Sequence, residues 1–238
     1  MCPQASHDTL GAIAAEVIAC RKCPRLVAHC EHIARVKRRA FRNEEYWGRP
    51  VPGFGDTQAG LILVGLAPAA HGANRTGRMF TGDRSGQWLY RALHRAGWAN
   101  TPQSNHRSDG LRLRGAYVTA AARCAPPANK PTREELGRCR PFLERELAYF
   151  LGRARRRPIV VLALGRIAHD ACLDALRNIG IGVPRPKPRF GHGAMTALDT
   201  NVTLLCSYHP SQQNTQTGRL TEPMFDSVFH AARRLLEP

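Results

Sequence analysis

The chain has 238 residues, of which 43% are hydrophobic, a composition typical of a folded globular protein. It contains no apolar run long enough to span a membrane, and its first ten residues lack the pattern of a secretion signal, so we expect a cytoplasmic protein without a membrane partner. Lys and Arg total 35 against 18 Asp and Glu, a formal net charge of +17. This imbalance favours a polyanionic partner, most commonly nucleic acid. A bias toward Arg explains the near absence of Lys, but it does not explain the deficit of acids.

Hydrophobic periodicity and turn residues predict helices alternating with short apolar strands. The N-terminal part is expected to contain a helical region at 12–42 broken near Pro24, a Pro/Gly loop at 48–56, a strand at 61–66, and a helix capped by Asp83 or Ser85 and ending at Gly97. The middle part is expected to contain a strand at 116–122, a helix at 132–151 with a Thr132/Glu135 capping box, a strand at 158–165 and a helix to about 178. The C-terminal part is expected to contain a Pro-rich surface crossing at 182–193, a strand at 202–206, a loop at 207–221 and a helix at 223–236.

Four apolar runs separated mainly by helices indicate an α/β fold, with a four-stranded parallel sheet between helical layers. We therefore predict a single domain over residues 1–238. Residues 1–56 form its N-terminal helical extension and loop. In such folds the ligand cleft lies beyond the carboxyl ends of the strands, so the loops after the first, second and fourth strands should meet there.

Two cysteine pairs are candidates for a metal site. Cys20 and Cys23 form a C-x-x-C pair, and Cys124 and Cys139 form a wider pair. Four thiolates in this arrangement suit zinc or an iron–sulfur cluster, and the spacing does not choose between them. The alternative is a set of independent buried thiols, as we interpret Cys2, Cys30, Cys172 and Cys206. Cys30 is close enough to Cys23 in sequence to replace a member of the proposed set.

Three loop motifs carry a family resemblance. GLAPAAHGANRTGRMFTGD follows the first strand, RCAPPANKP follows the second, and HPSQQN follows the fourth. Together they resemble the uracil-DNA glycosylases, and more narrowly the iron–sulfur-containing family 5, also called type B. The resemblance runs from Cys20 to about Thr221.

The resemblance implies a four-stranded parallel sheet between helices and a monofunctional enzyme of base excision repair. Such an enzyme hydrolyses the N-glycosidic bond of uracil in DNA and leaves an abasic site, and the family resemblance extends this to hypoxanthine and xanthine. It also implies a [4Fe–4S] cluster held by Cys20, Cys23, Cys124 and Cys139. The expected partner is DNA containing deaminated bases, which places the protein at the nucleoid, and we expect a monomer.

Asp83 and His209 are the predicted catalytic residues. The early part of the first loop contains no acid or amide, so Asp83 is the candidate that positions the attacking water. It is also a candidate helix N-cap, a role that would leave one carboxylate oxygen available. His209 could donate a hydrogen bond to the departing base. The alternative for His209 is a core or capping histidine.

Base recognition and DNA contacts are assigned to further loop residues. Phe80 could stack on a base rotated out of the duplex, unless it is simply a core residue. Asn129 would replace an asparagine that related enzymes carry at the end of the second strand, where this chain has Ala120–Ala122; otherwise it is a turn residue. Gly65 and Ala67 complete the predicted base-binding set. The predicted DNA contacts, each otherwise a solvated surface residue, are Arg75, Arg78, Arg219 and Gln213.

Two rival functions follow from the same sequence. A nucleic-acid-binding or redox protein could use the four cysteines without glycosylase activity, but it would need neither the FTGD loop nor the HPS loop. A dinucleotide-binding enzyme is excluded because GLAPAA lacks the glycine spacing of that motif.

Overall fold

The computed structural model describes residues 9–152 and 157–237, which form an α/β domain around a mixed six-stranded sheet. The strand order is β1-β3-β2-β4-β6-β5. The four predicted strands are the four central ones, and they pair in parallel as predicted. They are β2 (Leu61–Gly65), β3 (Ala116–Ala120), β4 (Ile159–Leu164) and β6 (Val202–Ser207). Their loops therefore open at the same edge of the sheet.

Two antiparallel edge strands were not predicted. β1 (Phe54–Gly55) pairs with β3 inside the segment expected to be a loop, and β5 (Met195–Asp199) pairs with β6. Neither has the continuous apolar run of a buried strand. β1 has only two residues, and most of β5 is exposed or half-buried. The prediction of four strands was therefore incomplete at both edges, where the sequence signal is weakest.

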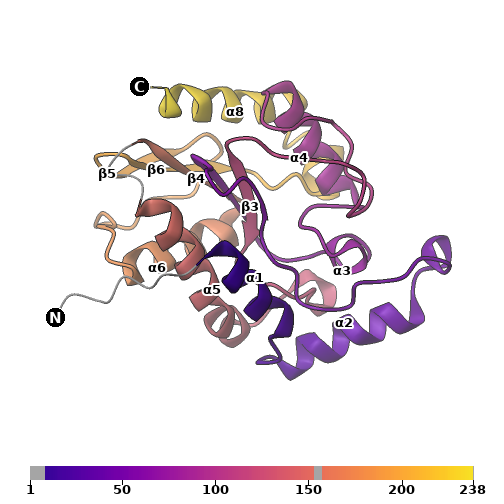
Figure 1. Cartoon of the computed structure of the whole chain (residues 1–238). Helices are drawn as coiled ribbons and strands as arrows, with labels where there is room; N and C mark the ends of the chain where they lie inside the picture. The colour runs from indigo at the N-terminus through magenta and orange to yellow at the C-terminus, as the bar shows by residue number, and fades with distance from the viewer. Residues whose placement is uncertain (1–8, 153–156, 238) are drawn as a thin grey trace.

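The helices form layers on both faces of the sheet (Figure 1). α4 and α8 cover one face, whereas α1, α5 and α6 cover the other. Within β2, Leu61 and Leu63 join the first core and Ile62 and Val64 join the second, because successive strand residues point to opposite faces. The helices are α1 (Leu10–Ala19), α2 (Pro24–Val36), α3 (Ala73–Thr76), α4 (Arg84–Arg95), α5 (Arg133–Leu151), α6 (Arg166–Asn178), α7 (Gln212–Gln216) and α8 (Glu222–Leu236), with 3-10 turns η1 (Arg39–Phe41) and η2 (Pro127–Asn129).

Helix boundaries follow the predicted signals. The expected N-terminal helical region is divided into α1 and α2, and Pro24 opens α2 at a position where its missing N–H is not needed. Thr132 and Glu135 form the predicted capping box of α5. The short helices α3 and α7 lie in the loops after β2 and β6, where no helix was predicted.

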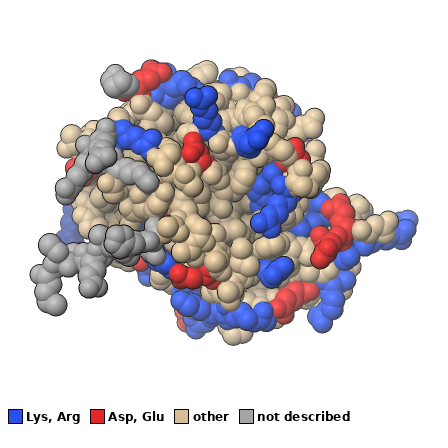
Figure 2. Space-filling model, viewed as in Figure 1, with Lys and Arg blue, Asp and Glu red and all other residues tan. Residues whose placement is uncertain are grey.

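Positive side chains are spread over the face drawn in Figure 2, with fewer acidic side chains between them. This agrees with the excess of 35 Lys and Arg over 18 Asp and Glu. In the described part of the chain, no helix combines the length and apolar character needed to cross a lipid bilayer.

Candidate active site

A cavity of about 440 Å³ opens at the carboxyl edge of the sheet. This volume is within the range of small-molecule sites. The loops after β2, β3 and β6 all contribute to its wall, as the topology predicted. Six predicted site residues line it: Ala67, Phe80, Asp83, Asn129, His209 and Gln213. Ser85, Ser211 and Gln212 also line it, although they were not among the predicted site residues.

Asp83 holds a fixed position because it caps α4. Its Oδ1 accepts a hydrogen bond from the Gly86 amide at 2.8 Å. Its Oδ2 lies against Gly72, where an added Cβ would be 2.0 Å from this oxygen. Burial raises the pKa of Asp83, although amide hydrogen bonds from Gly86 and Ser85 oppose the shift. The carboxylate therefore combines a structural bond with a position on the cavity wall.

Phe80 and His209 lie next to each other on the same wall. Their ring centroids are 5.8 Å apart, and the ring planes are inclined by 32°. The Phe80 backbone has a φ of 53°, an unusual conformation for a large side chain. An added Cβ on Gly65 would be 2.7 Å from the Phe80 ring, so only glycine permits this ring position. Gly65 thus supports Phe80 from β2 and is not itself a wall of the cavity.

His209 is neutral over most of the pH range, because burial lowers its pKa to about 4. Its backbone carbonyl accepts a hydrogen bond from Asn214 Nδ2 at 2.9 Å, and Ser211 caps the following helix, α7. These contacts fix the HPS loop relative to the cavity. A neutral imidazole with a fixed backbone can donate one N–H to a bound group.

Asn129 and Gln213 occupy the exposed rim of the cavity. Asn129 has a φ of 57°, which asparagine tolerates better than most residues. Arg219 is exposed beside an adjoining cavity of about 340 Å³, which His209 also lines. Its guanidinium lies 4.8 Å from the centre of the Tyr208 ring.

Arg75 and Arg78 are buried, an arrangement that does not favour the phosphate contacts predicted for them. Their exposed fractions are only 6% and 4%. Arg75 pairs with Glu44 and donates to the carbonyl oxygens of His71 and Gly82. Charged side chains with these internal partners stabilise the loop from inside the protein.

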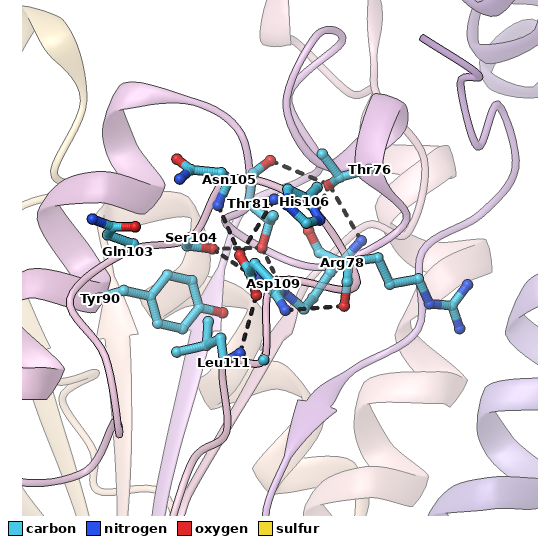
Figure 3. Close-up of polar contacts among 12 residues, drawn as sticks. Thr76, Arg78, Thr81, Tyr90, Gln103, Ser104, Asn105, His106, Asp109 and Leu111 are labelled. Carbon is cyan, nitrogen blue, oxygen red and sulfur yellow. Dashed lines mark hydrogen bonds and ion pairs between the residues drawn. The ribbon is translucent and has the colours of Figure 1, made fainter.

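Figure 3 shows the polar network around Arg78. Arg78 donates to Asp109 at 2.7 Å and to Thr81 at 2.9 Å, and Thr81 in turn contacts Ser104 at 2.8 Å. Burial alone would raise the pKa of Asp109, but hydrogen bonds from Arg78 and from backbone amides lower it to about 2. The segment between α4 and β3 is thereby tied to the FTGD loop. Sequence reasoning missed Asp109, since nothing local to it indicates a partner 31 residues away.

The four predicted metal-binding cysteines line one small cavity between the N-terminal helices, the loop after β3 and α5. Cys20 and Cys23 flank the break between α1 and α2, whereas Cys139 belongs to α5. The Cys30 thiol donates to the carbonyl oxygen of Ala125, the residue after Cys124, at 3.7 Å. Among residues 9–152 and 157–237, no three Cys, His, Asp or Glu side chains converge on a metal position as they stand.

The other thiols differ in their surroundings. Cys172 and Cys206 are buried in the core under the sheet, and burial raises the pKa of Cys206 to about 12. This agrees with their interpretation as ordinary thiols. Cys30 does not line the four-cysteine cavity, and Cys2 lies outside the described residues.

Comparison with known proteins gives consistent matches over most of the chain. The model of the uracil DNA glycosylase superfamily matches residues 52–233. A Type-5 uracil-DNA glycosylase of Mycobacterium tuberculosis is 53% identical over 92% of this chain and 79% of its own length. One of Thermus thermophilus is 54% identical over 91% of this chain and 94% of its own. A Type-4 uracil-DNA glycosylase of Pyrobaculum aerophilum is 29% identical over 70% of this chain and 74% of its own.

Proposed function

This chain belongs to the uracil-DNA glycosylase superfamily, as a DNA repair hydrolase acting on N-glycosyl bonds, and we propose that Asp83, His209 and Phe80 carry its reaction. The observation that carries the proposal is their meeting at one cavity of about 440 Å³, although they come from separate loops. A uracil rotated out of the duplex would occupy this cavity. Its bond to deoxyribose would then lie within reach of both polar side chains.

Asp83 and His209 suit opposite ends of the bond that breaks. The departing base gains negative charge while the sugar becomes cation-like. Asp83 would orient a water toward the sugar and stabilise its positive charge, and acid–base help of this kind contributes about 10²–10⁴-fold. His209, neutral because burial lowers its pKa to about 4, would donate a hydrogen bond to a base carbonyl as charge develops there.

Phe80 would stack on the extruded base, an interaction worth ~1–3 kcal/mol in comparable aromatic–base contacts. Asn129 would supply an amide to the base edge from the loop after β3. The residues Ala120–Ala122 at the end of β3 carry no polar group for the base. A pocket with so few fixed polar groups discriminates weakly between bases. We infer that hypoxanthine and xanthine are also substrates.

DNA contacts are proposed for exposed residues around the cavity. Arg219 would pair with a phosphate, and Gln213 on α7 would contact the strand next to the extruded nucleotide. The proposed site needs no residue from a second chain, and we propose a monomer as the active form.

The four cysteines are proposed to hold a [4Fe–4S] cluster, as the family resemblance implies. The donor set fits, because four thiols line one cavity and the Arg123 amide donates to Cys139 Sγ at 3.3 Å. Buried donors on the Arg123 side chain also lack a partner among the described residues, as expected beside a bound anionic group. The cluster would supply a cross-link between the N-terminal helices and α5, since hydrolysis transfers no electrons.

The function is tested with duplex oligonucleotides carrying a single uracil or hypoxanthine. We expect alkali-labile abasic sites at both bases, and none in a matched strand containing thymine. Metal content measured on the same sample shows whether the centre is loaded. Failure on uracil by a loaded sample would refute the glycosylase assignment. Cleavage at uracil alone would refute only the wider substrate range.

A further inference from the structure

Arg123 and Glu146 form a buried ion pair beneath β3. Both side chains are 1% exposed, and Arg123 Nη2 donates to Glu146 Oε2 at 2.5 Å. Glu146 also accepts from the hydroxyls of Tyr117 at 3.1 Å and Thr119 at 2.6 Å. The carboxylate therefore has three donors, and its position is set by β3 and by Arg123.

The arginine is less well satisfied than its carboxylate partner. Nε and Nη1 of Arg123 are buried and have no hydrogen-bond partner among the described residues. Guanidinium is never deprotonated in proteins, so these N–H groups remain charged donors. Buried charged donors without an acceptor are rare in folded proteins and require an explanation, such as a neighbouring anionic group.

The missing acceptor is explained by the position of Arg123. Arg123 lines the cavity that Cys20, Cys23, Cys124 and Cys139 also line, and it interacts electrostatically with Cys139. Its backbone amide already donates to Cys139 Sγ at 3.3 Å. Four thiolates around a metal centre carry net negative charge, and their sulfur atoms accept hydrogen bonds from N–H donors.

We propose that Arg123 is a positioning residue of the four-cysteine centre, whose Nε–H and Nη1–H donate to its sulfur atoms while Glu146 holds the guanidinium in place. The inference rests on the metal centre proposed above. Arg123 compensates the negative charge of the centre inside a cavity with little solvent. A cation and two donors stabilise the more negative, reduced state of an iron–sulfur cluster and so raise its reduction potential.

The test compares metal retention in the full-length protein, loaded as isolated. Arg123→Met combined with Glu146→Leu removes the pair without leaving an unpaired buried charge. We expect this variant to lose its metal to a chelator faster than wild type, because removing a group that orients metal ligands typically lowers metal affinity by about 10–100-fold. Iron and sulfide content and the decay of visible absorbance report the loss, and electrochemistry should show a lower potential.

The control is another buried pair of the same kind. Arg78→Met combined with Asp109→Leu removes an ion pair of 2.7 Å that does not line the cysteine cavity. Its metal retention should match wild type. If the Arg123/Glu146 double variant loses metal no faster than the Arg78/Asp109 double variant, the role of Arg123 is refuted.

If the double variant does not fold, Arg123→Lys is tested instead, because it keeps a positive charge beside Glu146. Lysine lacks the planar fork that serves Glu146 and sulfur together, so we expect faster metal loss. Retention equal to wild type would again overturn the inference. A wild-type chain that isolates without metal would refute the centre itself, and Arg123 with it. Uracil excision is measured separately and decides neither result.

Discussion

At the scale of single residues, the two oxygens of Asp83 separate its structural role from the chemical role proposed for it. Asp83→Asn keeps Oδ1 as the acceptor for the Gly86 amide, since asparagine is an equally good N-cap. It replaces the other oxygen with an uncharged NH₂ group, so the attacking water and the cation-like sugar lose the negative charge proposed to act on them. We expect turnover on uracil-containing DNA to fall by about 10²–10⁴-fold while the thermal unfolding midpoint and DNA affinity change little.

Single-turnover kinetics and thermal unfolding check this prediction. Thr132→Asn is a matched control, because it exchanges one N-cap residue for another at α5, outside the cavity. It should leave turnover unchanged. Turnover of Asp83→Asn near the wild-type value would show that Asp83 is only a cap.

His209 should make stability depend on acidity. Its folded pKa is about 4, against about 6.5 for an unfolded histidine. Between these values the unfolded chain binds the proton and the folded chain does not, so stability falls as pH falls through this window. The raised pKa of Asp83 acts in the opposite direction, so the comparison is made in an Asp83→Asn background.

Urea unfolding at pH 7 and pH 5 measures this effect. We expect the loss of stability between the two pH values to shrink when His209→Asn is added. An equal loss with and without His209 would contradict the low pKa. The same result would weaken its role as a neutral donor.

At the scale of loops, Arg219 and Arg78 should respond differently to replacement. Arg219→Gln should reduce the slope of log affinity for DNA against log salt by about 1, since one phosphate contact disappears. Arg78→Gln should leave this slope unchanged and destabilise the protein by about 3–5 kcal/mol, because Asp109 keeps a charge without its partner. Salt titrations of binding and urea unfolding separate the two. A reduced salt slope for Arg78→Gln would instead support its predicted DNA contact.

Arg219 and Arg78 illustrate which features of the structure could be predicted from the sequence and which could not. The four buried strands, the α4 and α5 caps and the convergence of three loops follow from local patterns, because apolar runs and cap residues act over a few positions. The burial of Arg78 depends on Asp109, and no local signal indicates that pairing. The edge strand β5 depends on β6 as a partner. Sequence could therefore predict the residues of the cavity, but not the direction of every side chain near it.

At the scale of the whole molecule, the four cysteines of the proposed metal centre come from parts of the chain that are distant in sequence. Cys20 and Cys23 lie at the break between α1 and α2, whereas Cys124 lies in the loop after β3 and Cys139 in α5. A group bound by the folded state and not by the unfolded chain adds its binding free energy to stability. Removing the metal of the proposed centre should therefore lower the thermal unfolding midpoint and make the region around α2 the first site of proteolysis.

Single substitutions identify the ligands behind this effect. Cys139→Ser should lose metal and show the same lowered midpoint as the chelated wild type. Cys30→Ser should retain metal, because Cys30 lies outside the four-cysteine cavity although it packs in the same buried cluster as Cys124. Metal content, unfolding midpoint and cleavage products are measured on each protein. If Cys30→Ser loses metal and Cys139→Ser keeps it, then Cys30 takes the place of Cys139, and the N-terminal helices are joined to the loop after β3 rather than to α5.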